Sequence, residues 1–383
     1  MRIAYVSTDA GIPVFGTKGA SIHVQEMLRA FLAQGAEISI LSPRIEGIPP
    51  VDLAGIVPVA LPSIPKGDPE TRARAVLALN NHVSHALSKM GPLDMIYERH
   101  ALHAHAAAEF AHQNNIPCIL EVNAPLIEEQ SRHRTLSLAT EAADSAYRAM
   151  AAASAVLAVS PSVGEYARSL GAGRVEVVPN AVSPARFPQC SAPDGPFTIA
   201  FLGSLKPWHD VATALDALAV LRQGPVPHAR MIVVGDGPER SKLSDHVTRL
   251  GLADAVTFCG AVSAAEVPKM LAQAHVGIAP YANSPDFYFS PLKLYEYMAA
   301  GLAVVASDVG HLAEVVKDGV TGLLTPPEEA AALAHLLAQL SVDDALRAAL
   351  GTAARAEVIA HHTWDGVASR VFALAGDRGT AAT

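Results

Sequence analysis

The sequence of 383 residues lacks any apolar run long enough to cross a lipid bilayer. Its longest predominantly apolar stretch, residues 149–159, is well short of the roughly 20 residues that a spanning helix requires. The N-terminal residues also lack the sustained hydrophobic segment of a secretory signal and reach an acidic side chain at Asp9. We therefore expect no transmembrane segment, a first β-strand at the N-terminus, and a cytoplasmic protein.

Cysteine and basic charge are both scarce. The three cysteines, Cys118, Cys190 and Cys259, are an odd number without metal-ligand spacing, which argues against a disulfide framework. The net charge is −9 and no basic run is present, whereas a nucleic-acid partner requires a basic stripe that neutralises phosphates. No nucleic acid is therefore expected. Peripheral contact with an anionic membrane stays open, with residues 69–89 as a candidate amphipathic helix.

Short apolar runs alternate with amphipathic segments, a pattern typical of parallel sheets covered by helices. A proline-rich stretch after Pro179 suits a linker, and the alternation restarts beyond it. The expected strands are residues 2–7, 37–41, 95–97, 118–122, 155–159 and 175–178, then 198–202, 230–234, 256–259, 276–279, 303–306 and 321–324. The expected helices of the first half are residues 21–34, 69–89, 101–114, 126–152 and 161–170.

This pattern predicts an α/β protein with two Rossmann-like lobes, whose parallel sheets face a central cleft. The first lobe is expected at residues 1–185 and the second at residues 186–362. A final helix within about 363–383 is expected to cross back to the first lobe. Ligands in such folds bind at the carboxyl ends of the strands.

One segment of the second half combines a helix start, a helix stop and two charges. Ser290 is suited to cap a helix, Pro291 to its first position and Gly301 to its end, which predicts a helix that begins at Ser290. Lys293 has the wrong sign for the positive end of a helix dipole unless an anion binds there. Glu296 lies on the same face. A nucleoside diphosphate would satisfy both charges, because the lysine can hold the diphosphate and the carboxylate can accept ribose hydroxyls. The alternative is a solvated ion pair.

A glycine-rich turn follows the first predicted strand. It resembles a phosphate-binding P-loop, but Lys18 comes after Thr17 instead of before it, so we reject an NTPase. Gly16 and Gly19 still allow backbone N–H groups to approach an anion or a sugar closely. The alternative is an ordinary mobile loop.

Two further turns of this kind close strand–helix units in the second half. Residues 203–209 (GSLKPWH) and 235–239 (GDGPE) each follow a predicted strand. Because the strands are expected to be parallel, Lys206 should point toward the same end of the cleft as Lys293.

Four blocks of sequence, in this order, resemble the retaining glycosyltransferases of glycosyltransferase family 4, which have the GT-B fold. They are residues 178–182 (VPNAV), 201–209 (FLGSLKPWH), 233–239 (VVGDGPE), and 290–301 (SPLKLYEYMAAG) followed by 304–310 (VVASDVG). The resemblance covers nearly the whole chain. It implies transfer of a sugar from a nucleotide-sugar donor, UDP- or GDP-linked, with retention of anomeric configuration and no further cofactor. It also implies that the second lobe binds most of the donor.

The sequence departs from the family pattern near the expected donor. The first of two family glutamates falls on Tyr288, with Asp286 as the nearest acid, whereas the second matches Glu296 as the ribose ligand. The family's diphosphate-binding arginine and lysine fall on Ser204 and His209. Whether Tyr288 or Asp286 replaces the first glutamate at the donor sugar stays open, and Lys206 and Lys293 are the expected substitutes at the diphosphate.

We expect Lys206 and Lys293 to stabilise the charge that develops on the leaving diphosphate, with Asn123 at the family's histidine position beside the reacting sugar. No Asp-x-Asp pair occurs in the sequence, so we expect a metal-independent enzyme. Without a placed nucleophile, the acceptor should attack on the face that the phosphate leaves, and the phosphate should take its proton. The expected donor-binding residues are Gly16, Gly19, Gly203, Ser204, His209, Gly235, Asp236, Gly237, Ser290, Pro291, Leu292 and Glu296.

The acceptor side is expected in the first lobe, where the candidates are His100, Glu121 and Glu128. Four histidines, at positions 100, 103, 105 and 112, follow one strand; they are open to interpretation as zinc ligands, solvated helix positions or cleft contacts. Surface acids at a helix start are the alternative for the glutamates. The acceptor is a glycan, a lipid-linked or a small-molecule hydroxyl. Two other functions stay open: a sugar-nucleotide epimerase of the same fold, and a non-catalytic two-lobed sugar-binding protein.

Overall fold

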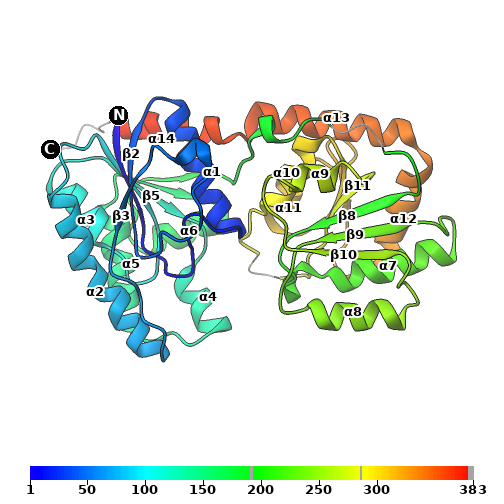
Figure 1. Ribbon diagram of the computed structural model, residues 1–383, viewed down its shortest axis with the longest axis horizontal. Helices are drawn as coiled ribbons and strands as arrows, with labels where there is room; N and C mark the ends of the chain where they lie inside the picture. Colours follow the sequence, from blue (N-terminus) through cyan, green and yellow to red (C-terminus); the bar gives the residue numbers. More distant parts are fainter. Residues whose placement is uncertain (190–192, 285–286, 378–383) are drawn as a thin grey trace. The chain divides into compact units, whose positions relative to one another are not determined.

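The structure, a computed structural model, describes residues 1–189, 193–284 and 287–377 (Figure 1). The chain forms two compact units: Met1–Pro179 together with the residues from Trp364 onward, and Asn180–Thr363. The boundary expected after residue 185 therefore lies a few residues too late. The C-terminal helix α14 (Trp364–Gly376) groups with the first unit. Cys190 and Asp286 lie outside the described residues.

A seven-stranded parallel sheet forms the centre of the first unit. Its strand order is β3-β2-β1-β4-β5-β6-β7, so the order reverses between β1 and β4. The strands are β1 (Arg2–Ser7), β2 (Glu37–Ser42), β3 (Val57–Ala60), β4 (Met95–Arg99), β5 (Cys118–Val122), β6 (Ala155–Ala158) and β7 (Val175–Val177). Besides α14, the α-helices are α1 (Gly19–Ala33), α2 (Pro69–Ser88), α3 (Ala106–Gln113), α4 (Leu126–His133), α5 (Ala139–Ala152) and α6 (Pro161–Ser169).

Helices cover both faces of this sheet. Alternate residues of a strand point to opposite faces; Ala4 and Val6 of β1 accordingly pack with α2 and α3. Tyr5, from the other face, contacts Tyr97, which lies against Phe31 of α1. Helices α1 and α14 lie side by side on that face (Figure 1).

The second unit repeats the same plan with six strands. The order β10-β9-β8-β11-β12-β13 reverses between β8 and β11. The strands are β8 (Thr198–Leu202), β9 (Arg230–Val234), β10 (Val256–Gly260), β11 (Val276–Ala279), β12 (Ala303–Ser307) and β13 (Leu323–Thr325). The helices are the 3₁₀ helices η2 (Pro184–Arg186) and η3 (Pro207–His209), then α7 (Val211–Gln223), α8 (Arg240–Arg249), α9 (Val267–Leu271), α10 (Leu292–Ala300), α11 (Gly310–Val315), α12 (Ala330–Val342) and α13 (Asp344–His361).

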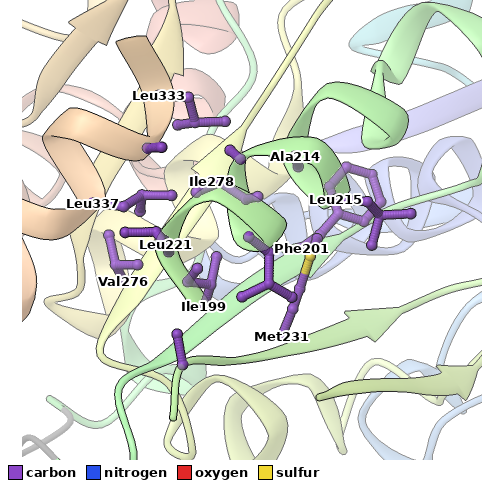
Figure 2. Packing of buried hydrophobic residues seen from close by; sticks show 14 of the residues in the cluster. Ile199, Phe201, Ala214, Leu215, Leu221, Met231, Val276, Ile278, Leu333 and Leu337 are labelled. Carbon is purple, nitrogen blue, oxygen red and sulfur yellow. The ribbon is translucent and has the colours of Figure 1, made fainter. Parts of the chain in front are cut away.

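Two apolar clusters hold the helices of the second unit to its sheet. On one face, side chains of the central strands pack against α7, α8 and α12; Figure 2 shows Phe201 and Ile278 of the strands among Leu215 and Leu337 of the helices. On the other face, buried residues of α9, α10, α11 and α13 form the second cluster. Helix α10, which carries Lys293, is therefore anchored at the sheet.

Three differences from the expected elements stand out in the first unit. Strand β3 was not expected. The helix predicted over residues 126–152 is two helices, α4 and α5, and α5 begins after Leu138, whose φ of 53° is left-handed. Helix α3 starts at Ala106, later than the predicted residue 101. Among the described residues, no helix combines the length and apolarity that a membrane-spanning segment needs.

Candidate functional site

Lys293 lies where the strand order of the second sheet reverses. It is in the first turn of α10, next to the ends of the neighbouring strands β8 and β11. Open α/β sheets bind ligands at this crevice. The residue is only 6% exposed, and its Nζ lies 4.2 Å from the centre of the Phe201 ring and 4.9 Å from that of Tyr281. No described residue accepts a hydrogen bond from this nitrogen.

The electrostatic setting of Lys293 is unfavourable for a lone cation. Burial lowers its pKa well below the ordinary lysine value, and the nearby charge of Glu296 opposes this shift without cancelling it. A buried ammonium has three donors to satisfy, and leaving them unpaired costs free energy. The first turn of a helix adds further N–H groups and the positive end of the helix dipole. An anion at this point would supply every missing acceptor.

The turn after β8 brings a second lysine and a histidine to the same crevice. His209 is buried, and its Nδ1 donates to the carbonyl of Ser204. Burial, together with the charges of Lys293 and Lys206, lowers the pKa of His209 to about 2. The imidazole is therefore neutral near pH 7. Lys206 and Lys293, and not His209, are the cations that an anion would meet here.

Three glycines allow two strand–helix turns to pack tightly together. A Cβ atom on Gly235 would lie 2.0 Å from the carbonyl oxygen of Gly203, and one on Gly237 would lie 2.5 Å from the backbone nitrogen of Leu205. The N–H of Leu205 also donates to the carbonyl of Asp236 over 3.0 Å. Packing thus accounts for the glycines at Gly235 and Gly237. Their expected contact with a donor, and that of the exposed Asp236, stay predictions.

Ser290 does not cap α10, so the expectation that the helix begins there is wrong. The helix begins at Leu292, with Pro291 at the N-cap position and no side-chain cap. The Ser290 hydroxyl instead accepts the backbone N–H of Asn180 over 3.0 Å and lies 3.0 Å from the Tyr295 hydroxyl. The Asn180 side chain donates to the Ser290 carbonyl. Ser290 therefore ties the segment before α10 to the beginning of the second unit.

A chain of hydrogen bonds fixes the direction of the Ser290 hydroxyl. His311 Nδ1 lies 2.6 Å from a carboxylate oxygen of Glu314, and its Nε2 lies 3.5 Å from the Tyr295 hydroxyl. Because a carboxylate only accepts, His311 donates from Nδ1, and in the neutral ring its Nε2 accepts from Tyr295. Tyr295 then accepts from Ser290. With this assignment of roles Ser290 donates to Tyr295, and a contact of Ser290 with the donor stays a prediction.

Glu121, in the first unit, lies inside β5. It is buried, and its carboxylate contacts His23 Nε2 at 2.5 Å and the Arg99 guanidinium at 2.9 Å. Burial alone would raise its pKa, but the charges of His23 and Arg99 outweigh burial and lower the pKa to about 2. The network links β5 with α1 and β4. The carboxylate is thus held by two partners inside the first unit, and its place beside an acceptor stays a prediction.

The other acceptor candidates lie in different surroundings. His100 follows β4 and is buried, with neither ring nitrogen bonded to a described residue; burial lowers its pKa to about 4. Asn123 follows β5, and its buried Nδ2 likewise has no partner in the described chain. Glu128 is exposed in the first turn of α4. No three His, Cys, Asp or Glu side chains within the described ranges are grouped to hold a metal ion.

The loop before α1 is held in place by that helix. The side-chain amide of Gln25 donates to the carbonyls of Val14 and Gly16, at 3.0 and 2.9 Å. A Cβ atom on Gly16 would lie 2.8 Å from the Ser21 hydroxyl. Helix α1 begins at Gly19, which is exposed. The loop is thus anchored by α1, and its contact with a ligand stays a prediction.

Two sequence profiles of known families match this chain. The profile described as Glycosyl transferases group 1 matches residues 183–357, and the profile described as Glycosyltransferase Family 4 matches residues 17–186. The two matches meet close to the boundary between the two structural units. Each unit therefore corresponds to one recognised glycosyltransferase segment.

Individual known proteins show the same similarity. A phosphatidyl-myo-inositol mannosyltransferase of Mycolicibacterium smegmatis is 34% identical over 213 residues, which are 53% of this chain and 52% of that protein. The matched chain thus spans about half the length of this relative. A sucrose-phosphate synthase from Thermosynechococcus elongatus has a TM-score of 0.77 at 21% identity, covering 97% of this chain and 98% of the other. The Anabaena protein HepE, solved with UDP-glucose, has a TM-score of 0.73 at 19% identity, covering 98% and 100%. These structures confirm the predicted fold class.

Proposed function

The chain belongs to glycosyltransferase family 4, with the GT-B fold, and on that premise we propose that it transfers a sugar from a nucleoside diphosphate sugar to a hydroxyl-bearing acceptor. The observation that carries the proposal is the buried Lys293 ammonium, which lacks an acceptor among the described residues and lies at the crevice of the second sheet. A diphosphate has the charge and the oxygen atoms that this site lacks. The similar HepE structure contains UDP-glucose, which supports this class of ligand.

Each charged side chain of the crevice takes one part of the donor in this proposal. Lys293 and Lys206 hold the diphosphate, and Glu296, three residues further along α10, accepts the ribose hydroxyls. As the bond between the sugar C1 and the diphosphate oxygen breaks, negative charge grows on the leaving group. Fixed cations therefore stabilise the transition state more than the ground state.

The transfer proceeds with retention and without a metal ion. The acceptor oxygen bonds to C1 on the face that the diphosphate leaves, and its proton passes to a diphosphate oxygen. No residue has to form a covalent intermediate. The two lysines provide the positive charge that a metal would otherwise bring to the diphosphate. Trapping a covalent sugar–protein adduct would contradict this route.

A donor screen followed by product analysis tests the proposal. We expect one UDP- or GDP-sugar to raise the unfolding temperature, since a ligand at 100 times its Kd adds about 2.7 kcal/mol of stability. Turnover should release the nucleoside diphosphate with or without EDTA, and NMR should show the donor's anomeric configuration in the product. Lys293→Met should lower turnover about 100- to 1,000-fold, whereas Lys269→Met, on an exposed lysine of α9, should leave it unchanged.

Three outcomes would overturn the proposal. An isomerised nucleotide sugar without release of the diphosphate would indicate an epimerase. Sugar binding without turnover for any donor and acceptor pair would indicate a binding protein. Full activity of Lys293→Met would show that transfer does not need Lys293, on which the proposal depends.

A further inference from the structure

A group of aromatic rings adjoins the crevice of the second unit. The rings of Trp208 and Phe289 are stacked, with centroids 5.9 Å apart and an angle of 12° between their planes. The ring centre of Tyr288 lies 4.3 Å from that of Phe289. Trp208 is in η3, which follows the turn after β8, and Phe289 precedes α10. Both are only half-buried, unlike the fully buried Tyr281 beside them. Part of this aromatic surface is thus open to solvent.

Each of the two lysines lies near a ring of this aromatic group. The Nζ of Lys206 lies 5.7 Å from the centre of the Trp208 ring. The ring centre of Tyr281 lies 6.4 Å from that of Phe289 and 4.9 Å from the Nζ of Lys293. A continuous set of contacts therefore runs from one lysine to the other through the aromatic rings. A diphosphate held by these lysines would have the rings as immediate neighbours.

The order of residues along the chain indicates which part of a donor meets the rings. Phe289 comes before α10, Lys293 lies in its first turn, and Glu296 lies one turn further. With the diphosphate at Lys293 and the ribose at Glu296, the group on the opposite side of the diphosphate is the transferred sugar. The base is separated from Phe289 by the ribose and both phosphates. Aromatic faces pack well against apolar C–H groups, and such contacts add to affinity.

We propose that Trp208 and Phe289 form the platform for the donor's sugar ring, and that the sugar is a pyranose with an unbroken C–H face toward these rings. The inference rests on the proposed function, because it takes the diphosphate to lie at Lys293 and Lys206. It assigns binding of the sugar to the aromatic pair and binding of the nucleotide to the charged residues. The two parts of the donor should therefore respond to different substitutions.

Tryptophan fluorescence can observe this platform directly. The chain has two tryptophans, so Trp364→Phe leaves Trp208 as the sole indole. Trp364 lies in α14 of the first unit, against His23. In this background we expect UDP-glucose, UDP-galactose or GDP-mannose, whichever the protein binds, to change the Trp208 emission. The matching nucleoside diphosphate should bind by calorimetry with a much smaller change in emission, which arises from Lys206 beside the ring. The full change with the nucleoside diphosphate alone would overturn the inference.

Substitutions of the platform give an independent test. We expect Trp208→Ala and Phe289→Ala to weaken binding of the nucleotide sugar about tenfold while changing the Kd of the nucleoside diphosphate less than twofold. Trp208→Phe should recover most of the loss, because an aromatic face is kept. Should the alanine variants fail to fold, Trp208→Leu against Trp208→Phe provides the same comparison.

The outcomes separate the two proposals. Equal loss of affinity for the nucleotide sugar and the nucleoside diphosphate would overturn the platform but leave the glycosyltransferase assignment intact. Failure of the unsubstituted protein to bind any nucleoside diphosphate would overturn the proposed function itself. Unchanged affinity for the nucleotide sugar in Trp208→Ala, with the fold intact, would also overturn the platform.

Discussion

The Cε and Nζ atoms of Lys293 both lie 3.1 Å from the position that a Cβ atom would take on Gly203. Gly203 also has a φ of 142°, which disfavours other residues. Any side chain at this position would therefore displace the ammonium that we place at the diphosphate. Because of this close approach, the glycine at position 203 allows both the conformation of the turn and the position of the Lys293 ammonium.

Gly203→Ala should weaken binding of a nucleoside diphosphate roughly tenfold or more, because contacts of the displaced Lys293 are lost. Gly251→Ala is the matched control: it also has a positive φ, of 69°, but nothing lies within 4 Å of its Cβ position. Backbone strain of about 1–3 kcal/mol should destabilise both variants. Calorimetric titration should show weakened binding only for Gly203→Ala. Equal affinities in the two variants would contradict the prediction.

Binding of a nucleoside diphosphate should take up protons. Burial lowers the pKa of Lys293 well below the ordinary lysine value, so the ammonium loses its proton at a lower pH than a free lysine does, and an arriving anion favours the charged form. Affinity should therefore fall as the pH rises through the lowered pKa. Titration calorimetry over a series of pH values, in buffers with different ionisation enthalpies, measures the uptake. Lys293→Met should abolish it, and an undiminished uptake in that variant would point to another group.

Substitutions of Ser290 and Lys293 should have opposite effects on stability and on donor affinity. Ser290→Ala removes the acceptor of the Asn180 N–H and the donor to Tyr295, so we expect a loss of about 1–3 kcal/mol in stability with little change in donor affinity. Lys293→Met removes a buried unpaired cation, so we expect equal or higher stability but greatly weakened binding. Urea unfolding and calorimetry measure the two quantities. Weakened binding with unchanged stability in Ser290→Ala would show that the hydroxyl contacts the donor after all.

Glu98 should make stability depend on pH. It is buried in β4, where it accepts the N–H of Ala108, and burial raises its pKa from 4.5 to about 7. The folded state holds this proton more tightly than the unfolded state. The contribution of Glu98 to stability is therefore fully present below pH 4.5 and is lost as the pH rises through about 7.

Glu98→Gln keeps the acceptor and removes the titration. We expect it to be more stable than the parent protein above pH 7, by up to about 3 kcal/mol, with the difference shrinking toward pH 4.5. Urea unfolding between pH 4.5 and 8 measures the difference. Glu141→Gln, on an exposed side chain in the first turn of α5, should show none. A difference for Glu98→Gln that does not vary with pH would contradict this assignment.

Most strands could be predicted from the sequence because each central strand is a short apolar run bounded by turn residues. Strand β3 could not, since Val57–Ala60 is short, contains Pro58 and is mostly exposed at the edge of the sheet. The break between α4 and α5 was missed because no glycine or proline marks it. Leu138 adopts the left-handed conformation there instead.

The sequence predicts only those parts of the candidate site whose residues are close together along the chain. Lys293 and Glu296 are three residues apart, so helix geometry alone places them together. Ser290 looked like a cap because the sequence does not show that Asn180, 110 residues earlier, competes for its hydroxyl. The stack of Trp208 on Phe289 likewise joins distant segments.

Glu121 illustrates the same limit in the first unit. From the sequence alone, Glu121 near Asn123 suggests an exposed acid at the end of a strand. Its partners His23 and Arg99 come from α1 and β4, and only the parallel register, which pairs Arg99 with Glu121, brings them together. Nothing in the local sequence distinguishes such a buried ion pair from a surface acid.

The last helix, α14, completes the first unit, whereas α13, directly before it, belongs to the second. The second unit is therefore an insert within the first, and the gene does not fall into two halves that could be recombined at a single crossover. A chimera that took everything after residue 179 from another gene would lose the helix on which His23 and Phe31 pack. Recombination that exchanges the second unit therefore has to transfer residues 180–363 with two junctions.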